Sequence, residues 1–369
     1  MPGSADDAPL APLGRLALTA VELRRVAMPL IRPFHTAGGI RRERDVLLVR
    51  VLGTEGEEGW GECVADTTPG YTPEYLDGCA HVLRTFVLPW VFEWRSVGVD
   101  DEHLGAPGHG MAQAALRDAV LDALLRRSGL ALAGWLGATR KTVPATLTLG
   151  LGDEPEAGPY HSVKLKLNRS TEAAPFVQRL RADGVEAVSA DANGSLDLAG
   201  LLAHDRARLD HIEQPLGVTD LVGHAEARRR SSTPIALDEP ITGVDAIRTV
   251  AALGAADLVV VKPGRVGGVV AARTCVEEAA ALGLGVKVGG MLETGIGRAA
   301  TLAVAALPGC TAAADLSASD RYWGDDDLTE PCPLDAHGCL TVPTGPGTGV
   351  TVGADRLDRC TTALENHRP

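Results

Sequence analysis

The second half of the chain has a regular repeat that strongly limits its fold: short apolar runs alternate with stretches rich in Ala, Leu and Arg. Lys166 and the four polar residues that end the next such runs follow one another at intervals of 22 to 25 positions. Each interval is about the length of one strand-and-helix unit. These four are Asp191, Glu213, Asp238 and Lys262. The apolar runs span 145–149, 163–167, 187–190, 210–212, 234–237, 258–261, 286–288 and 313–315. Eight strands alternating with helices predict an α/β fold, a parallel barrel of the TIM type.

One connection in this repeat is unusually short. Between the first two runs only residues 153–161 (DEPEAGPYH) are available, and they contain two prolines and a glycine. A parallel crossover normally needs about a dozen residues that include a helix. We therefore expect a modified (β/α)7β barrel whose first helix is missing.

The remaining sequence predicts further parts around this barrel. Residues 16–63 are typical of a three-stranded antiparallel meander, and residues 72–95 and 110–128 have helical apolar spacing. A length of 369 residues suits two domains. We expect a disordered tail over 1–15, an N-terminal α+β capping domain over 16–141, the barrel over 142–322, and a C-terminal segment over 323–369 that returns to the capping domain.

Composition disfavours several classes of function. The net charge is -13 and the basic residues are scattered, which argues against a nucleic-acid partner. No apolar run approaches the roughly 18 to 20 residues needed to span a bilayer, and the N-terminus has no secretory pattern. The seven cysteines include no C-x-x-C pair, so a zinc site and a disulfide framework are both disfavoured. We expect a cytoplasmic enzyme with a small-molecule substrate and no membrane partner.

The strand ends of a parallel barrel converge on one mouth, so Asp191, Glu213 and Asp238 should form one carboxylate cluster. A single acid at such a position is more often a helix cap, but three on successive strands weaken that interpretation. Clustered carboxylates need a compensating charge, and hard oxygen ligands suit Mg²⁺ better than zinc. Lys166 and Lys262 would flank the ion, and a lysine in this position can act as a base that removes the α-proton of a substrate carboxylate. The ion would stabilise the enediolate that forms when this proton leaves. The lysines could instead form a structural salt-bridge network with the acids.

The motifs V-K-L-K-L, D-A-N, I-E-Q-P, L-D-E-P, V-K-P-G-R-V-G-G and G-G-M-L-E-T-G-I-G-R-A together resemble the enolase superfamily, in its muconate-lactonizing-enzyme subgroup. More narrowly, the chain is similar to the o-succinylbenzoate synthase/N-succinylamino acid racemase family. The stretches RRVAMPLIRPFHTAGG, GWGECVADTTPGYTPEYLDG and SASDRYW support this resemblance. Enolase-superfamily sites combine a Lys or His base with Mg²⁺.

The resemblance implies roles for individual residues. Lys166 would be the acid/base, Lys164 the neighbour that tunes it, and Lys262 the opposing lysine. The implied ligands of Mg²⁺, for which Mn²⁺ can substitute, are Asp191, Glu213 and Asp238. Contacts to the metal shell or the substrate are implied for Asn193, Arg265, Glu239, Gly290, Met291, Phe34 and Tyr71. Two loops of the capping domain, 31–39 and 65–78, would close over the mouth, although their aromatic residues could equally pack the domain interface.

Some residues near the mouth depart from the family pattern. The short first crossover is one departure, and the proline in L-D-E-P, where the family tends to have serine, is another. His211 replaces a usually apolar residue, and we expect it to be a neutral, hydrogen-bonded histidine in a lower barrel layer. Lys287 has no histidine partner, which disfavours the mandelate-racemase arrangement.

The function that the resemblance implies first is a carbon–oxygen lyase. It would dehydrate 2-succinyl-6-hydroxy-2,4-cyclohexadiene-1-carboxylate to o-succinylbenzoate in menaquinone biosynthesis. The alternatives are racemisation of N-succinylamino acids, both activities in one protein, or a barrel that binds a carboxylate without turnover. Dipeptide epimerisation is disfavoured because S-A-S-D-R-Y lacks paired acids. A homo-oligomer is also expected.

Overall fold

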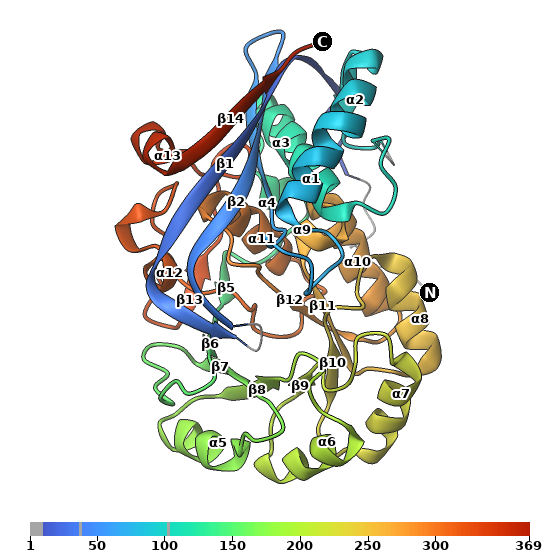
Figure 1. Ribbon diagram of the computed structural model, residues 1–369, viewed down its shortest axis with the longest axis vertical. Coiled ribbons are helices and arrows are strands. Elements are labelled where there is room, and N and C mark those ends of the chain that lie inside the picture. Colours follow the sequence, from blue (N-terminus) through green and yellow to red (C-terminus); the bar gives the residue numbers. More distant parts are fainter. Residues whose placement is uncertain (1–9, 37–38, 102–103) are drawn as a thin grey trace.

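Two sheets organise the chain in the computed structural model, which describes residues 10–36, 39–101 and 104–369 (Figure 1). A capping sheet at one end is antiparallel and has the order β14-β1-β2-β3, with β4 paired to β1. Its strands are β1 (Arg15–Thr36), β2 (Gly39–Gly53), β3 (Glu58–Cys63), β4 (Ser96–Gly98) and β14 (Thr361–His367). The predicted antiparallel cap is confirmed, and the C-terminal segment supplies its edge strand β14.

Helices cover one face of the capping sheet. They are α1 (Leu76–Val82), one π-helical turn (Leu83–Val87), α2 (Leu88–Trp94) and α3 (Gly110–Ser128). The short helix α4 (Leu132–Trp135) follows them and packs against the barrel helix α11 (Gly295–Ala305). Strand β3 packs directly on the backbone of α3, because a Cβ atom added at Gly61 would lie 2.0 Å from the carbonyl oxygen of Ala115. Glycine is therefore required at this crossing.

The second sheet is parallel and has the order β12-β11-β10-β9-β8-β7-β6. Its strands are β6 (Thr146–Leu149), β7 (Ser162–Lys166), β8 (Ala187–Asp191), β9 (Ile212–Glu213), β10 (Ile235–Leu237), β11 (Leu258–Val261) and β12 (Gly285–Val288). Residues 313–315 close the ring, since Ala314 forms a bridge with Ala145 and Asp315 forms one with Gly289. The eighth predicted strand thus consists of single bridges, and the modified barrel is confirmed.

Helices follow most barrel strands on the outside of the ring (Figure 1). They are α5 (Ala173–Ala182), α6 (Leu198–His204), α7 (Leu221–Arg230), α8 (Val244–Leu253), α9 (Pro263–Val266), α10 (Val269–Ala281), α11 (Gly295–Ala305) and α12 (Ser319–Tyr322). No helix occurs among residues 150–161, which lie between β6 and β7. The missing first helix is therefore confirmed.

The remaining elements join the two parts. Strands β5 (Thr142–Pro144) and β13 (Cys339–Thr341) pair with each other, and α13 (Ala354–Cys360) leads into β14. Of the tail expected over residues 1–15, residues 1–9 lie outside the described part of the chain. Within residues 10–14, Leu13 is buried and the carbonyl of Ala11 accepts a hydrogen bond from Trp135.

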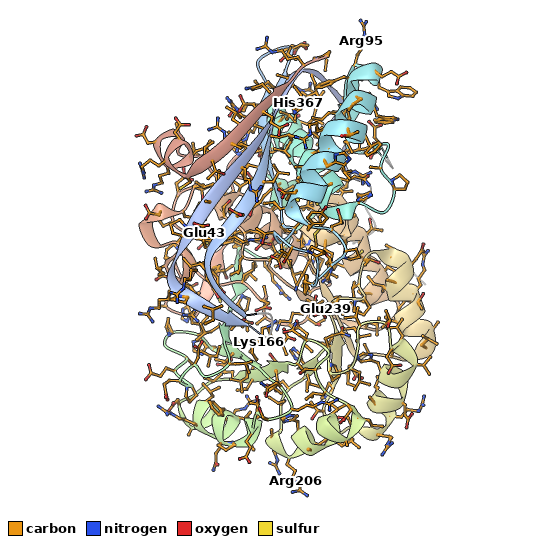
Figure 2. All side chains as sticks on the ribbon, in the orientation of Figure 1. Glu43, Arg95, Lys166, Arg206, Glu239 and His367 are labelled. Atoms are coloured by element: carbon orange, nitrogen blue, oxygen red, sulfur yellow. The ribbon has the colours of Figure 1, made fainter. Side chains whose placement is uncertain are left out.

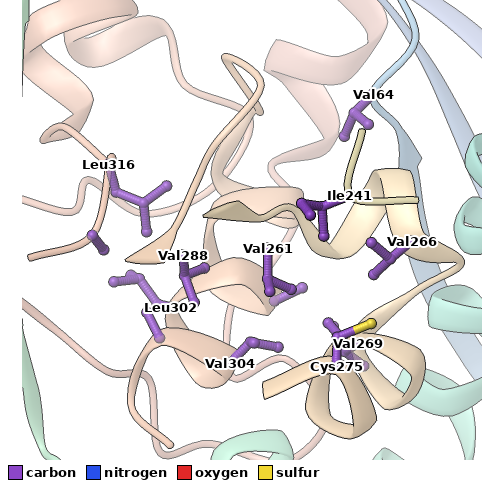
Figure 3. Packing of buried hydrophobic residues seen from close by; sticks show 14 of the residues in the cluster. Val64, Ile241, Val261, Val266, Val269, Cys275, Val288, Leu302, Val304 and Leu316 are labelled. Carbon is purple, nitrogen blue, oxygen red and sulfur yellow. The ribbon is translucent and has the colours of Figure 1, made fainter. Parts of the chain in front are cut away.

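The barrel strands are buried on both faces, as expected of a parallel sheet under helices. Val261 of β11 and Val288 of β12 lie close to Leu302 and Val304 of α11 (Figure 3). The intervening strand residues point into the ring, where several are polar. The helix-facing side chains stabilise the barrel by packing, whereas the inward side chains include the polar groups that can take part in a reaction. None of the described helices is long and apolar enough to cross a membrane.

Candidate active site

The carboxyl ends of the barrel strands border a cavity of about 590 Å³. Residues 66 and 68–71, in the loop after β3, form one wall of it, so the capping part contributes to the site. Figure 2 shows Lys166 and Glu239 in this region, between the capping sheet and the barrel strands. Small-molecule sites usually have volumes of about 300 to 1,000 Å³, so the cavity is large enough for a small organic acid.

Lys166, at the end of β7, lies against the end of β8. Its Nζ donates to Asp191 Oδ2 at 2.6 Å and to Asn193 Oδ1 at 2.8 Å. Strand register makes Lys166 and Asp191 direct neighbours, because the two residues are paired in the parallel ladder. Burial favours a neutral Asp191, but the charges of Lys166 and Lys164 outweigh it and lower the pKa of this carboxyl.

Lys164, two residues earlier on the same strand face, lies deeper in the barrel and is buried. Its ammonium bonds both oxygens of Glu213, at 3.1 and 3.2 Å, and also pairs with Asp315 and with Asp191. Burial lowers the pKa of Lys164, but these three carboxylates together hold it well above the ordinary value. Lys164 is therefore a permanent cation at this depth.

The opposite side of the mouth is built from β10, β11 and the capping loop. Lys262 Nζ lies 2.8 Å from Asp238 Oδ2, and Arg265 Nη1 lies 2.8 Å from Asp238 Oδ1. The hydroxyl of Tyr71 donates to Asp238 at 2.6 Å and accepts from Lys262 and Arg265 at 2.6 and 2.7 Å. Although burial favours a neutral Asp238, these cations keep its pKa well below the usual range. Tyr71 of the loop after β3 is thereby tied to the barrel.

Lys166 and Lys262 face each other across the mouth. Their strands, β7 and β11, are separated by the three strands β8, β9 and β10 in a ring of eight positions. Strands four positions apart in such a ring lie on opposite sides of it. The three acids Asp191, Glu213 and Asp238 come from the ends of the strands from β8 to β10, so they lie between the two ammonium groups.

The donor chemistry of these acids suits a hard divalent cation. All three carboxylates are buried, and each is held by a lysine in an ion pair. Beside them, Glu239 is buried and its Oε2 has no hydrogen-bond partner among the described residues. Within that same part of the chain, no three His, Cys, Asp or Glu side chains are grouped as a complete metal site. An oxygen-preferring cation would have to displace ammonium contacts, and the residues fit it chemically.

Most residues predicted for the site are brought together. The cavity wall includes Lys164, Lys166, Lys262, Asp191, Asp238, Asn193, Glu239, Gly290, Met291 and Tyr71. Glu213 and Arg265 lie behind this wall and reach the site only through their partners. Asn193 also donates to Glu239 at 3.1 Å. The side chain of Phe34 lies outside what the structure describes, so its predicted contact stays a prediction.

Sequence reasoning missed several wall residues, and Asp315 is the clearest. It pairs with Lys164 and accepts from Thr148 at 2.9 Å. It ends the eighth apolar run, so it obeys the same rule that identified the other acids. Glu293 and Arg298 also border the cavity. They lie in and just after the G-G-M-L-E-T stretch, but spacing alone gives no reason to select them.

His211 differs in one respect from expectation. It is buried, and burial lowers its pKa well below the ordinary value, which agrees with a neutral ring. Its Nε2, however, has no hydrogen-bond partner among the described residues. The expected hydrogen bond is therefore absent at that atom among the described residues.

Comparison with known proteins gives consistent matches. The family model "Enolase C-terminal domain-like" matches residues 153–356. An N-succinylamino acid racemase from Amycolatopsis sp is 42% identical, with 94% of this chain and 98% of the relative covered. An o-succinylbenzoate synthase from Bacillus subtilis (strain 168) is 34% identical, with 95% and 98% covered. A solved structure of a probable mandelate racemase from Alicyclobacillus acidocaldarius is 35% identical, with a TM-score of 0.85 and with 95% of this chain and 99% of that chain covered.

Proposed function

The chain belongs to the enolase superfamily, in the family of o-succinylbenzoate synthases and N-succinylamino acid racemases, and we propose that it racemises N-succinylamino acids. The observation that carries this proposal is the pair Lys166 and Lys262, which face each other from strands on opposite sides of the mouth. Racemisation needs one proton acceptor and one proton donor on opposite faces of a carbon. The 42% identical racemase supports the same choice.

In the proposed reaction the substrate carboxylate enters the carboxylate-lined mouth and places its α-carbon between the two lysines. One lysine, in its neutral form, takes the α-proton as the C–H bond breaks. The ammonium of the other lysine then delivers a proton to the opposite face of the same carbon, which forms the inverted C–H bond. The reverse direction exchanges the two roles, so both enantiomers are substrates.

The proposed ligands for Mg²⁺ are Asp191, Glu213 and Asp238. When bound, the ion supplies positive charge that offsets the negative charge gained by the substrate carboxylate as its α-proton leaves. The chain itself adds a fixed cation, because Lys164 stays protonated between Glu213 and Asp315. Arg265 holds Asp238 from behind and thereby fixes one acid of the cluster.

Synthesis of o-succinylbenzoate is a second candidate, supported by the 34% identical synthase from Bacillus subtilis. Here Lys166 would take the α-proton and then return a proton to the leaving hydroxyl, which departs as water. Lys262 would remain a cation and only stabilise charge. The two candidates share the first proton transfer and differ in whether Lys262 must exchange a proton.

Proton exchange in deuterated water tests the proposal. The protein with Mg²⁺ should incorporate deuterium at the α-carbon of both N-succinyl enantiomers. Lys166→Ala and Lys262→Ala should each abolish racemisation and each abolish exchange from one enantiomer. Lys287→Met is a matched control, because this buried lysine lies in the same barrel but not on the cavity wall. Absence of exchange in the wild type, together with o-succinylbenzoate formation in a parallel assay, would favour the synthase instead.

A further inference from the structure

The loop between β12 and α11 borders the cavity with four consecutive residues, Gly290 to Glu293. Within it, Leu292 has a φ of 60°, which is the left-handed region that a leucine rarely adopts. A backbone conformation of this kind costs about 1 to 3 kcal/mol and persists only where the surroundings impose it. The contacts at the two ends of the loop must therefore hold its shape.

The first end is held within the barrel. The amide of Gly289 donates to Val261 at 2.9 Å, and the amide of Gly290 donates to Asp315 at 3.1 Å. These two bonds continue the ladder of the ring, so they fix where the loop begins. They cannot fix its far end, which lies beyond Leu292.

The capping sheet helps to hold the far end, beside the bonds that the Glu293 carbonyl accepts from Arg298 and Trp323. Glu62 of β3 accepts from the amide of Thr294 at 3.1 Å, from the Thr294 hydroxyl at 2.7 Å and from the amide of Gly297 at 3.0 Å. Glu62 is only 5% exposed, so water does not compete for these donors. A carboxylate at a helix N-terminus satisfies amides that have no partner inside the helix. Here that carboxylate comes from 232 positions away, in the other sheet.

A second acid anchors the same helix end from a different direction. Asp327 accepts from the amide of Gly295 at 2.7 Å and pairs with Arg298 at 2.8 Å. This pair alone could cap the helix. Glu62 adds the bonds to Thr294, the residue that directly follows Glu293 of the cavity wall.

We propose that Glu62 is a positioning residue for the substrate: through Thr294 it holds the strained Gly290–Glu293 loop in the shape that receives the substrate. This inference rests on the proposed function. Because the proton-transferring lysines are on other strands, loosening the loop weakens substrate binding more than it slows proton transfer. The capping sheet thereby sets substrate affinity through a contact outside the cavity.

The test compares Glu62→Gln with Asp122→Asn. Asp122 is an equally buried acid that also holds β3, accepting from the Trp60 amide at 3.0 Å and the Thr348 amide at 2.7 Å, but it does not touch the loop. In Glu62→Gln the side-chain amide retains one acceptor oxygen and turns an NH₂ group toward a donor, so about one hydrogen bond is lost. That loss corresponds to about a fivefold effect.

Hydrogen exchange of the ligand-free protein is the first measurement. Peptides that cover residues 289–297 should exchange about fivefold faster in Glu62→Gln and at the wild-type rate in Asp122→Asn. In the kinetic measurement, Glu62→Gln should raise KM for N-succinylamino acids about fivefold with kcat within about twofold. Equal exchange in the two variants, or a lower kcat with unchanged KM, would overturn the proposal.

Two further readouts keep the outcomes separate. If Glu62→Gln does not fold, Thr294→Ala removes the 2.7 Å hydroxyl bond to Glu62 together with the 3.3 Å bond from the Ile296 amide, and it should still speed loop exchange. Thr294→Ser keeps both bonds and should restore the wild-type rate. If the wild type does not turn over N-succinylamino acids, the proposed function fails, but the exchange experiment still decides whether Glu62 holds the loop.

Discussion

Replacing Lys287 by methionine should stabilise the protein. Lys287 is 1% exposed, on the inner face of β12, and no hydrogen bond or ion pair to its ammonium occurs among the described residues. Burial lowers its pKa below the ordinary value despite the nearby charges of Asp315 and Glu213. The folded protein thus bears a desolvation cost for this ammonium that these two carboxylates only partly offset.

The magnitude follows from comparison with Lys164, which is buried in the same ring but pairs directly with Glu213, Asp315 and Asp191. Replacing buried charge by an apolar side chain of similar volume commonly stabilises by about 1 to 4 kcal/mol, whereas breaking a buried pair costs about 3 to 5 kcal/mol. Lys287→Met and Lys164→Met should therefore differ by at least about 4 kcal/mol, with opposite signs.

Urea unfolding followed by tryptophan fluorescence at pH 7 measures both variants. The pH dependence gives a second check on Lys287. Because its pKa is lowered in the folded state, the unfolded chain binds more protons at this group between that lowered pKa and 10.5. The penalty is full below the lowered pKa and disappears as pH rises toward 10.5, so the gain from Lys287→Met should shrink over that range. A similar loss of stability in both variants at pH 7 would mean that the Lys287 ammonium is paired in the folded protein, which would refute the reasoning.

Two further predictions use other features of the molecule. Gly61→Ala should lower the free energy of unfolding by about 3 kcal/mol, because its Cβ would lie 2.0 Å from a backbone oxygen, whereas Gly134→Ala, with open space around it, should change stability by less than about 1 kcal/mol in urea unfolding. Chelation with EDTA should abolish α-proton exchange, Mg²⁺ should restore it, and a chelator-insensitive rate would argue against the proposed metal.

The sequence predicts the barrel well because its repeat is dictated by burial. Each strand must be apolar because it lies under the helices, and each lysine or acid of the site follows the end of its strand. The apolar runs and the polar residues that end them are therefore visible in the sequence as a regular pattern. The same rule applies to Asp315. This residue is easily missed because its run is only three residues long and forms single bridges instead of a ladder.

Contacts between the sheets have no comparable local signal. Nothing in G-W-G-E-C indicates that Glu62 caps a helix 232 positions away, and nothing near Tyr71 indicates that its hydroxyl contacts Asp238. The sequence predicts strand β14 only as a segment returning to the cap, since its residues alternate weakly and all of them are at least partly exposed. Such pairings depend on how the two sheets meet, which periodicity along the chain does not encode.

The origin of each part of the site suggests a division of labour between the two sheets. The lysines and carboxylates come from barrel strands whose positions the ring fixes within the backbone ladder. Two groups that close and shape the cavity come from the capping part, Glu62 from strand β3 and Tyr71 from the loop after it, and both reach the barrel through side-chain contacts. Side-chain contacts can change without disturbing the ladder, because no strand hydrogen bond depends on them. Substrate choice can therefore change through the cap while the proton-transfer groups stay in place, which fits a family whose members are named for two different reactions.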